Sequence, residues 1–334
     1  MSHPPIHVVG AGAVGTVLAA YLAEARHPAR LIVRPRDLDR MAQAQALCVD
    51  RVAGRGMLQL PKPEITANYR LAEGDIVLLC VKHRDLEDVM AQIEAAGQTR
   101  LTLVPCLNGV GAAATLRRRF PEAEVVPLTV MFNAQLLEAL HARMTTKPQI
   151  LLNTRDKSLL ALFRDSDLQV QQAEDESVAW GKLLINLANG LAALTHTTFK
   201  DLLTNPDMKR CFVLTLDEAT TVLDRAGVAY TLPVPLSYRA YRAVLTHGGP
   251  LPWWFARLRN GLSESSYPSM VADVESGKET EVAQLNGEIV TLAQENQLPA
   301  PINALIVDMV QALHGQPQDY FLSPAALRSR LEAA

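Results

Sequence analysis

The chain has 334 residues, of which 49% are hydrophobic, and a formal net charge of −3. This length suffices for about two domains with full cores, and the charge gives no basic surface of the kind that nucleic-acid binding requires. The chain does not begin with a basic region and a long apolar segment, and no stretch approaches about 18 uninterrupted apolar residues, so we expect neither a signal peptide nor a membrane span. The four cysteines are far apart and lack metal-ligand spacing, which favours reduced thiols, a cytoplasmic location and no metal site.

A glycine-rich motif follows the first apolar run of the chain. The segment Gly10-Ala-Gly-Ala-Val-Gly15 comes directly after residues 6–9 and directly before a helix-compatible stretch at residues 16–22. In dinucleotide-binding folds the first glycine allows a tight turn, the second lets the backbone approach a pyrophosphate, and the third lets helix pack on strand. The sequence therefore predicts a nucleotide site formed by Gly10, Ala11, Gly12, Ala13, Val14 and Gly15.

An arginine, rather than an acidic residue, ends the second predicted strand. Residues 29–33 are strand-like and lead into Arg34, with Arg36 two positions further on. An NAD site usually carries Asp or Glu there to accept hydrogen bonds from the ribose, whereas a guanidinium suits the 2′-phosphate of NADP. Arg34, with or without Arg36, therefore favours NADP(H), although both could be solvated loop residues.

Further apolar runs predict a parallel sheet in the first half of the chain. Residues 75–81 and 101–106 are nearly continuous apolar runs, as expected of strands covered on both faces. Residues 124–131 and 149–152 are candidates to continue the same sheet. The predicted fold of residues 1–165 is thus an α/β, doubly wound Rossmann-type domain.

Helical patterns dominate the second half, which we predict to be an all-helical domain at residues 166–334. Breaks are expected at residues 230–235 and 247–254, where proline and glycine gather. Substrate is expected between the two domains. The predicted helices cover residues 176–200, 207–226, 237–246, 267–276, 279–297 and 302–313.

Polar residues stand directly after two of the predicted strands. Lys82 follows one strand and Asn108 the next, so both would project from the carboxyl ends of parallel strands, where open α/β sheets bind ligands. The alternative is a solvated lysine and an ordinary Asn-Gly turn.

A second set of polar residues lies within an apolar helical stretch. Lys182 and Asn186 are four residues apart and share a helix face, with Asn189 close to the same face. Burying them needs partners, and burial would lower the lysine pKa, which suits an acid that protonates an alkoxide. Alternatively, the stripe is an exposed helix edge.

Together these motifs resemble the ketopantoate reductase family over nearly the whole chain. The resemblance implies an NADP-binding Rossmann domain followed by a helical domain like the C-terminal domain of 6-phosphogluconate dehydrogenase. It also implies NADPH-dependent reduction of 2-dehydropantoate to (R)-pantoate in pantothenate biosynthesis. The matching segments are residues 10–15, 80–83, 107–111, 180–186, 268–277, 279–282 and 285–287, and Arg34 matches the family's NADPH-selecting arginine.

The resemblance also implies roles for individual residues. Lys182 is similar to the general acid and Glu281 to the carboxylate near the substrate hydroxyl and the cofactor. Without the resemblance, Ser269 would be interpreted as a helix N-cap and Glu281 as an exposed helix acid. The implied cofactor contacts are residues 10–15, Arg34, Lys82, Asn108, Ala134 and Glu281, and the implied substrate contacts are Lys82, Asn108, Lys182, Asn186 and Ser269.

Three departures from the family leave the substrate open. Gly190 and Ser266 stand where well-known members carry asparagines, and residues 230–260, with Trp253 and Trp254, are longer than in compact members. The two tryptophans could line an entrance or pack within the domain. The alternatives are reduction of another small 2-keto acid and a non-catalytic, NADPH-binding regulatory role. A homodimer is an option, because related helical domains often pair.

Overall fold

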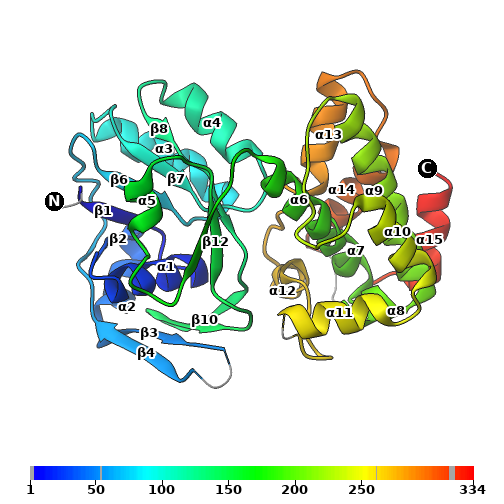
Figure 1. Cartoon of the computed structure of the whole chain (residues 1–334), viewed down its shortest axis with the longest axis horizontal. Helices are drawn as coiled ribbons and strands as arrows, with labels where there is room; N and C mark the ends of the chain where they lie inside the picture. The colour runs from blue at the N-terminus through cyan, green and yellow to red at the C-terminus, as the bar shows by residue number, and fades with distance from the viewer. Residues whose placement is uncertain (1–3, 53–54, 261, 316–319) are drawn as a thin grey trace. The chain divides into compact units, whose positions relative to one another are not determined.

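The computed structural model describes residues 4–52, 55–260, 262–315 and 320–334, and the chain forms two compact units, Met1–Asp175 and Glu176–Ala334 (Figure 1). The division falls later than the predicted boundary at residue 165. The reason is that β13 (Gln169–Gln172) pairs with β12 (Gln149–Leu152) and so belongs to the first unit.

The first unit is built around a six-stranded parallel sheet in the order β5-β2-β1-β6-β7-β8. The chain extends the sheet from β1 toward one edge and then from β6 toward the other, which is the Rossmann strand order and confirms the predicted fold. The strands are β1 (Ile6–Val9), β2 (Arg30–Ile32), β5 (Ile65–Thr66), β6 (Ile76–Leu79), β7 (Thr102–Pro105) and β8 (Glu124–Val125).

Helices cover both faces of this sheet. Successive side chains of a strand point to opposite faces, and in β6 Ile76 and Leu78 join the core that packs on α1, whereas Val77 and Leu79 join the core under α3 and α4 (Figure 1). Burial on both faces explains why the sequence of β6 is continuously apolar. The helical segments are α1 (Ala13–Glu24), η1 (Pro35–Asp37), α2 (Leu38–Ala42), η2 (His83–Asp85), α3 (Leu86–Ala95), α4 (Gly111–Arg119) and α5 (Lys157–Ala161).

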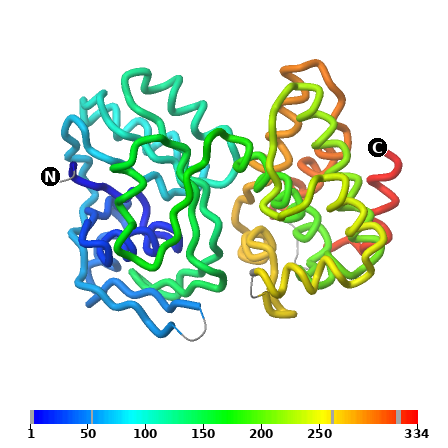
Figure 2. The backbone as a smooth tube through the Cα atoms, viewed as in Figure 1, coloured from blue at the N-terminus to red at the C-terminus, as the bar shows by residue number. Residues whose placement is uncertain are grey.

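Two smaller sheets were not predicted. One joins the hairpin of β3 (Ala46–Asp50) and β4 (Met57–Pro61) to that of β10 (Ala134–Glu138) and β11 (His141–Met144), and Figure 2 shows these distant segments side by side. The other contains β13, β12 and β9 (Leu128–Val130). The expectation that residues 124–131 and 149–152 continue the main sheet was therefore wrong except for β8. Pro127 lacks the N–H that a continued ladder would need.

The described part of the second unit contains helices and no strand, as predicted. Helix α9 lies at its centre and contacts α7, α8, α13, α14 and α15. The run Ser177–Thr195 is apolar and long enough to cross a membrane, but 67% of it is buried, as in a core helix. The helices are α6 (Ser177–Asn186), α7 (Ala188–Thr195), α8 (Phe199–Thr204), α9 (Pro206–Arg225), α10 (Tyr238–His247), α11 (Leu251–Asn260), α12 (Ser269–Glu275), α13 (Asn286–Glu295), α14 (Pro301–Ala312) and α15 (Pro324–Glu332).

Several helix boundaries differ from the prediction. Residues 176–200 do not form one helix. Leu187 separates α6 from α7 although its backbone angles are helical, and α7 ends before His196, whose φ is +50°. Residues 279–280 are irregular and residues 281–285 are bends and turns, so α13 begins only at Asn286 and Glu281 precedes it. The predicted break at 247–254 was wrong from Leu251 onward. Pro252 stands at the second position of α11, where a helix tolerates proline.

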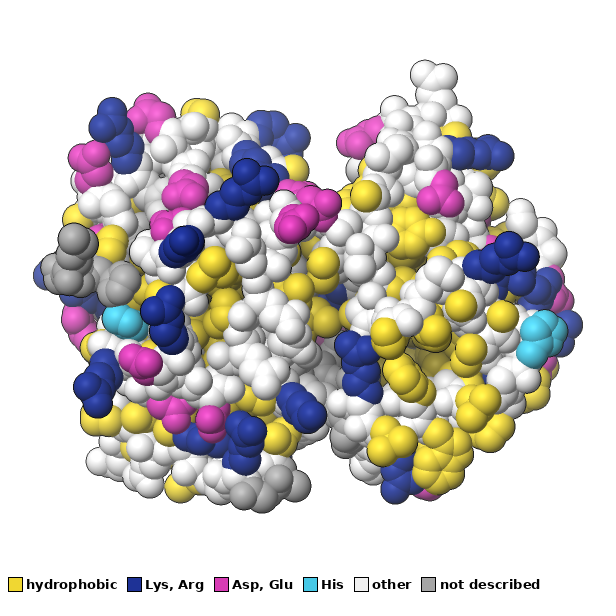
Figure 3. Space-filling model, in the orientation of Figure 1, with side chains coloured by type: hydrophobic (Ala, Val, Ile, Leu, Met, Phe, Trp, Pro, Cys, Tyr) yellow, Lys and Arg dark blue, Asp and Glu magenta, His cyan; other side chains and the backbone are white. Residues whose placement is uncertain are grey.

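Helix α11 presents an apolar face to solvent. Trp253 is buried, but Trp254 is 50% exposed, so only the first tryptophan packs within the unit. Leu251, Phe255 and Leu258 are also exposed, and apolar side chains gather over this helix in Figure 3.

Candidate active site

Two glycines of the predicted nucleotide motif are required by packing between β1, α1 and β6. A Cβ atom on Gly10, whose φ is +97°, would lie 2.7 Å from the carbonyl oxygen of Cys80. A Cβ on Gly15 would lie 1.9 Å from the carbonyl oxygen of Gly10. These positions exclude any side chain and account for the first and third glycines of the motif.

Gly12 has a different environment. A Cβ atom there would meet nothing within 4 Å, so protein packing does not require glycine at this position. Gly12 is exposed and precedes α1, whose first turn has no acidic residue and no side-chain cap. Ala13 and Val14, the first residues of α1, are half-buried. An open glycine at an uncapped helix start suits the approach of an anionic group such as a pyrophosphate.

A crevice of about 530 Å³ opens beside this motif. Its size falls within the usual range for small-molecule sites. Its lining brings together five predicted cofactor residues, Gly10, Ala11, Gly12, Arg34 and Lys82. The other predicted cofactor residues of this unit lie outside that lining: Ala13, Val14, Gly15, Asn108 and Ala134.

Charged side chains surround Arg34 at one part of the crevice. The Nε atom of Arg34 lies 2.9 Å from Oδ2 of Asp37, and its Nη1 atom lies 3.7 Å from Oδ2 of Asp85. Arg40 also lines the crevice, whereas Arg36 does not. Sequence reasoning missed Arg40 and Asp37, and the available signal was their charge on the short helical segments that follow β2.

A histidine joins the loops that carry Lys82 and Asn108. Lys82 is exposed after β6, Asn108 is half-buried after β7, and Nε2 of His83 lies 2.5 Å from the backbone oxygen of Asn108. Because that oxygen can only accept, His83 donates the hydrogen bond. His83 was part of a matching motif but had no predicted role. Ala134 instead pairs with Met144 across β10 and β11, and Leu136, two residues later, lines the crevice.

In the second unit, Lys182 and Glu281 interact electrostatically. Lys182 lies on α6, four residues before Asn186, and both side chains are half-buried. Burial lowers the pKa of Lys182 to about 8, and the charge of Glu281 opposes this shift. A lysine with this pKa can exchange its proton near neutral pH. Asn189 is buried within α7.

Gly190 lies where α7 approaches α13 and α14. A Cβ atom there would be 2.8 Å from Cγ2 of Ile306 and 2.9 Å from Oδ1 of Asn286. Asn286 is fully buried, and its Nδ2 atom donates to Oδ1 of Asn303 at 3.0 Å. The position therefore has no room for an asparagine side chain without movement of its neighbours.

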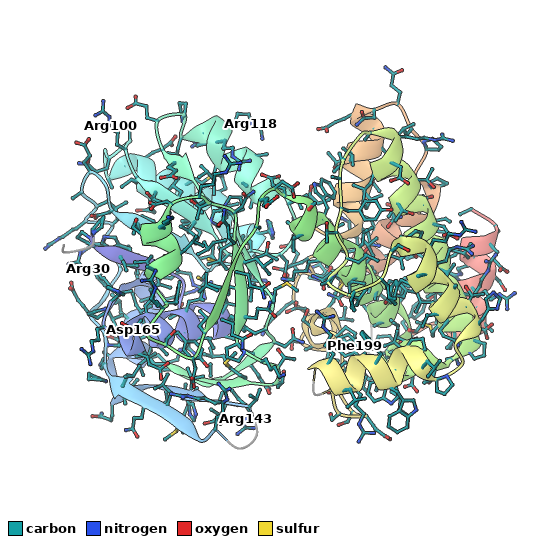
Figure 4. The ribbon with its side chains drawn as sticks, in the orientation of Figure 1. Arg30, Arg100, Arg118, Arg143, Asp165 and Phe199 are labelled. Atoms are coloured by element: carbon teal, nitrogen blue, oxygen red, sulfur yellow. The ribbon has the colours of Figure 1, made fainter. Side chains whose placement is uncertain are left out.

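The two serines near α12 have different surroundings. Oγ of Ser266 accepts a hydrogen bond from the backbone N–H of Ser263 at 3.0 Å and lies 2.8 Å from the Ser263 hydroxyl. Its carbonyl accepts from the backbone N–H of Phe199, which is labelled in Figure 4. Ser269 is exposed at the start of α12, but the N-cap is Pro268 and has no side-chain capping bond. The interpretation of Ser269 as an N-cap was therefore wrong.

Metal ligands are not clustered in the part of the chain that the structure describes. Among its residues, no group of three or more His, Cys, Asp or Glu side chains could hold a metal ion.

Both units match one protein family. Residues 6–157 match the family described as ketopantoate reductase PanE/ApbA, and residues 176–314 match its C-terminal domain. A 2-dehydropantoate 2-reductase from Aquifex aeolicus is 25% identical over 321 residues, covering 91% of this chain and 95% of that protein.

Solved structures share the fold over nearly the whole chain. A PanE/ApbA family ketopantoate reductase from Ralstonia eutropha has a TM-score of 0.76 at 24% identity and covers 93% of this chain and 98% of its own. D-mandelate dehydrogenase with NADH and anilino(oxo)acetate has a TM-score of 0.76 at 18% identity, with 93% and 98% covered. A dimeric ketopantoate reductase from Staphylococcus aureus has a TM-score of 0.71 at 19% identity, again with 93% and 98% covered.

Proposed function

Because the chain belongs to the ketopantoate reductase family, we propose that it reduces 2-dehydropantoate to (R)-pantoate with NADPH, in pantothenate biosynthesis. As a member, it is a pyridine-nucleotide-dependent oxidoreductase that acts on CH–OH groups. The observation that carries the proposal is the pKa of Lys182. Burial lowers it to about 8, and the charge of Glu281 opposes the shift.

The glycine motif and Arg34 fit the proposed cofactor. Gly12 leaves open space beside an uncapped helix start, and Arg34 supplies a guanidinium at the crevice. Bound NADPH would supply the hydride that reduces the ketone carbon. Lys82, Asn108, Ala134 and Glu281 are the further proposed cofactor contacts.

Lys182 acts as the general acid in this proposal. Negative charge builds on the ketone oxygen during reduction, and the ammonium group stabilises it by a hydrogen bond and then donates a proton. A pKa of about 8 keeps the group mostly protonated at neutral pH but ready to give up its proton. Glu281 favours the charged form, so it helps Lys182 to recover a proton after each turnover.

Neutral polar groups complete the proposed substrate site. The Asn186 amide and the Ser269 hydroxyl can bind a carboxylate and a hydroxyl without adding charge. Lys82 and Asn108 are the substrate contacts that we propose on the first unit.

A second candidate is the reduction of another small 2-keto acid. Gly190 has no room for the asparagine of well-known members, and the Ser266 hydroxyl is engaged within its own loop. A site without these two amides has fewer groups for a distal substrate hydroxyl. The structural neighbour named D-mandelate dehydrogenase illustrates a different substrate on this fold. A non-catalytic NADPH-binding role is disfavoured by the Lys182–Glu281 interaction.

We also propose a homodimer and a cytoplasmic location. The dimeric Staphylococcus aureus relative supports the first, with the helical unit serving substrate binding and dimerisation. The free thiols of all four cysteines suit a reducing compartment.

The deciding experiment measures nicotinamide absorbance with NADPH and 2-dehydropantoate, in parallel with pyruvate, 2-ketoisovalerate and phenylglyoxylate. Wild type and Lys182→Ala are compared. Turnover selective for 2-dehydropantoate and lost in Lys182→Ala supports the proposal. Selectivity for another keto acid moves the function to the second candidate. NADPH binding without turnover of any of them favours the non-catalytic role.

A further inference from the structure

The carboxylate of Asp37 bridges two arginines at the crevice. Its Oδ2 atom lies 2.9 Å from Nε of Arg34, and its Oδ1 atom lies 3.4 Å from Nη2 of Arg40. All three residues line the crevice. The two guanidinium groups therefore contact the same carboxylate, within residues 34–40, which follow β2.

The local helix does not explain the position of Asp37. Asp37 stands at the N-cap of α2, where an aspartate usually accepts hydrogen bonds from the first N–H groups of the helix. Its side chain makes no such bond. Its carboxylate is 19% exposed, compared with 47% for Arg34 and 56% for Arg40, so the acid lies beneath the two exposed bases.

Arg40 counters the negative charge that two carboxylates place beside Arg34. A phosphate monoester carries a charge of about −1.5 to −2 at neutral pH. Arg34 alone faces two carboxylates, Asp37 at 2.9 Å and Asp85 at 3.7 Å, and these offset its single positive charge. Arg40 adds a positive charge at the other oxygen of the Asp37 carboxylate and brings the net charge of these four side chains to zero.

From this geometry we infer that Arg40 is a second contact for the 2′-phosphate of NADP(H) and sets the preference for NADP(H) together with Arg34. The inference rests on the proposed function in so far as the cofactor is NADP(H). The competing interpretation is that Asp37 accepts hydrogen bonds from an unphosphorylated ribose, as acidic residues do in NAD sites.

The test uses calorimetric binding of 2′,5′-ADP and 5′-AMP, which differ only in the 2′-phosphate, to the full chain. Wild type is expected to bind 2′,5′-ADP more tightly. Arg40→Met should weaken the binding of 2′,5′-ADP by about tenfold or more, the usual effect of losing a charge-assisted hydrogen bond, and leave 5′-AMP unchanged. Arg36→Met is the matched control, because Arg36 is an exposed neighbour outside the crevice lining, and it should change neither affinity.

Each other outcome overturns the inference in a distinguishable way. Unchanged 2′,5′-ADP affinity in Arg40→Met shows that Arg40 makes no phosphate contact. An equal loss for both probes shows a general effect on α2. Equal affinities of the wild type for both probes refute NADP(H) as the preferred cofactor, and thus that part of the proposed function, before any variant is considered.

Discussion

Gly15 packs so closely on Gly10 that a Cβ atom on Gly15 would lie 1.9 Å from the Gly10 carbonyl oxygen. The obstacle is backbone at the junction of β1 and α1, so it cannot move aside as a flexible side chain would. We expect Gly15→Ala to destabilise the protein by about 1–3 kcal/mol, the usual cost of overpacking. Thermal or urea unfolding measures this change, and a variant as stable as wild type would contradict the packing.

Gly12→Ala should leave the stability of the protein unchanged but weaken its binding of NADPH. Its Cβ would meet nothing within 4 Å, so we expect unfolding to be nearly unchanged. If a pyrophosphate approaches this backbone, the added methyl group should weaken NADPH binding by about tenfold, since a short displacement of a bound group is costly. NADPH titration by fluorescence measures the effect. Normal NADPH affinity in a well-folded Gly12→Ala would place the nucleotide elsewhere.

The pKa of Lys182 gives a prediction on pH dependence. If Lys182 must be protonated to act, the rate should fall as pH rises through about 8, rather than near the ordinary lysine value of 10.5. Glu281 raises this pKa, so Glu281→Gln should move the decline to lower pH. Profiles of kcat/KM against pH for both proteins measure the shift. A decline at the same pH in Glu281→Gln would show that the two groups do not interact.

The hydrogen bond from His83 to Asn108 predicts a role for His83 in positioning the loop after β7. His83→Phe should raise the KM for NADPH by about two- to tenfold, the range expected for one lost hydrogen bond, with a smaller effect on kcat. His83→Gln keeps a donor and should recover most of the loss. His141→Phe, on β11, is the matched control. Equal KM values in His83→Phe and wild type would remove the positioning role.

The fold class was predictable because it depends on local patterns. The glycine motif, the continuous apolar runs of β6 and β7 and the long helical periodicities each reflect a few neighbouring residues. The limits of the helices were less predictable. Residues 279–285 have helix-compatible composition, yet they are irregular or form bends and turns before α13, so the position of Glu281 is set by tertiary packing rather than by propensity.

The candidate site was predictable where the chain supplies a motif and unpredictable where separate segments meet. Lys182 could be predicted from its spacing to Asn186 on one helix face, and Arg34 from its position after the second strand. His83 contacts a residue 25 positions away. The crowding at Gly190 involves Asn286 and Ile306 from two other helices, which no local pattern reveals.

Gly190→Asn would introduce the asparagine that the resemblance to the family implies at this position. We expect the variant to be less stable by about 1–3 kcal/mol, because its Cβ would lie 2.8 Å from Cγ2 of Ile306 and 2.9 Å from Oδ1 of Asn286. Gly190→Ala is the matched control. Since it adds only the Cβ, an equal loss of stability in thermal unfolding would assign the effect to that atom. The opposite result would be a Gly190→Asn protein that unfolds like wild type and turns over 2-dehydropantoate faster. It would show that α13 and α14 move to accommodate the side chain, and that the glycine limits recognition of that substrate.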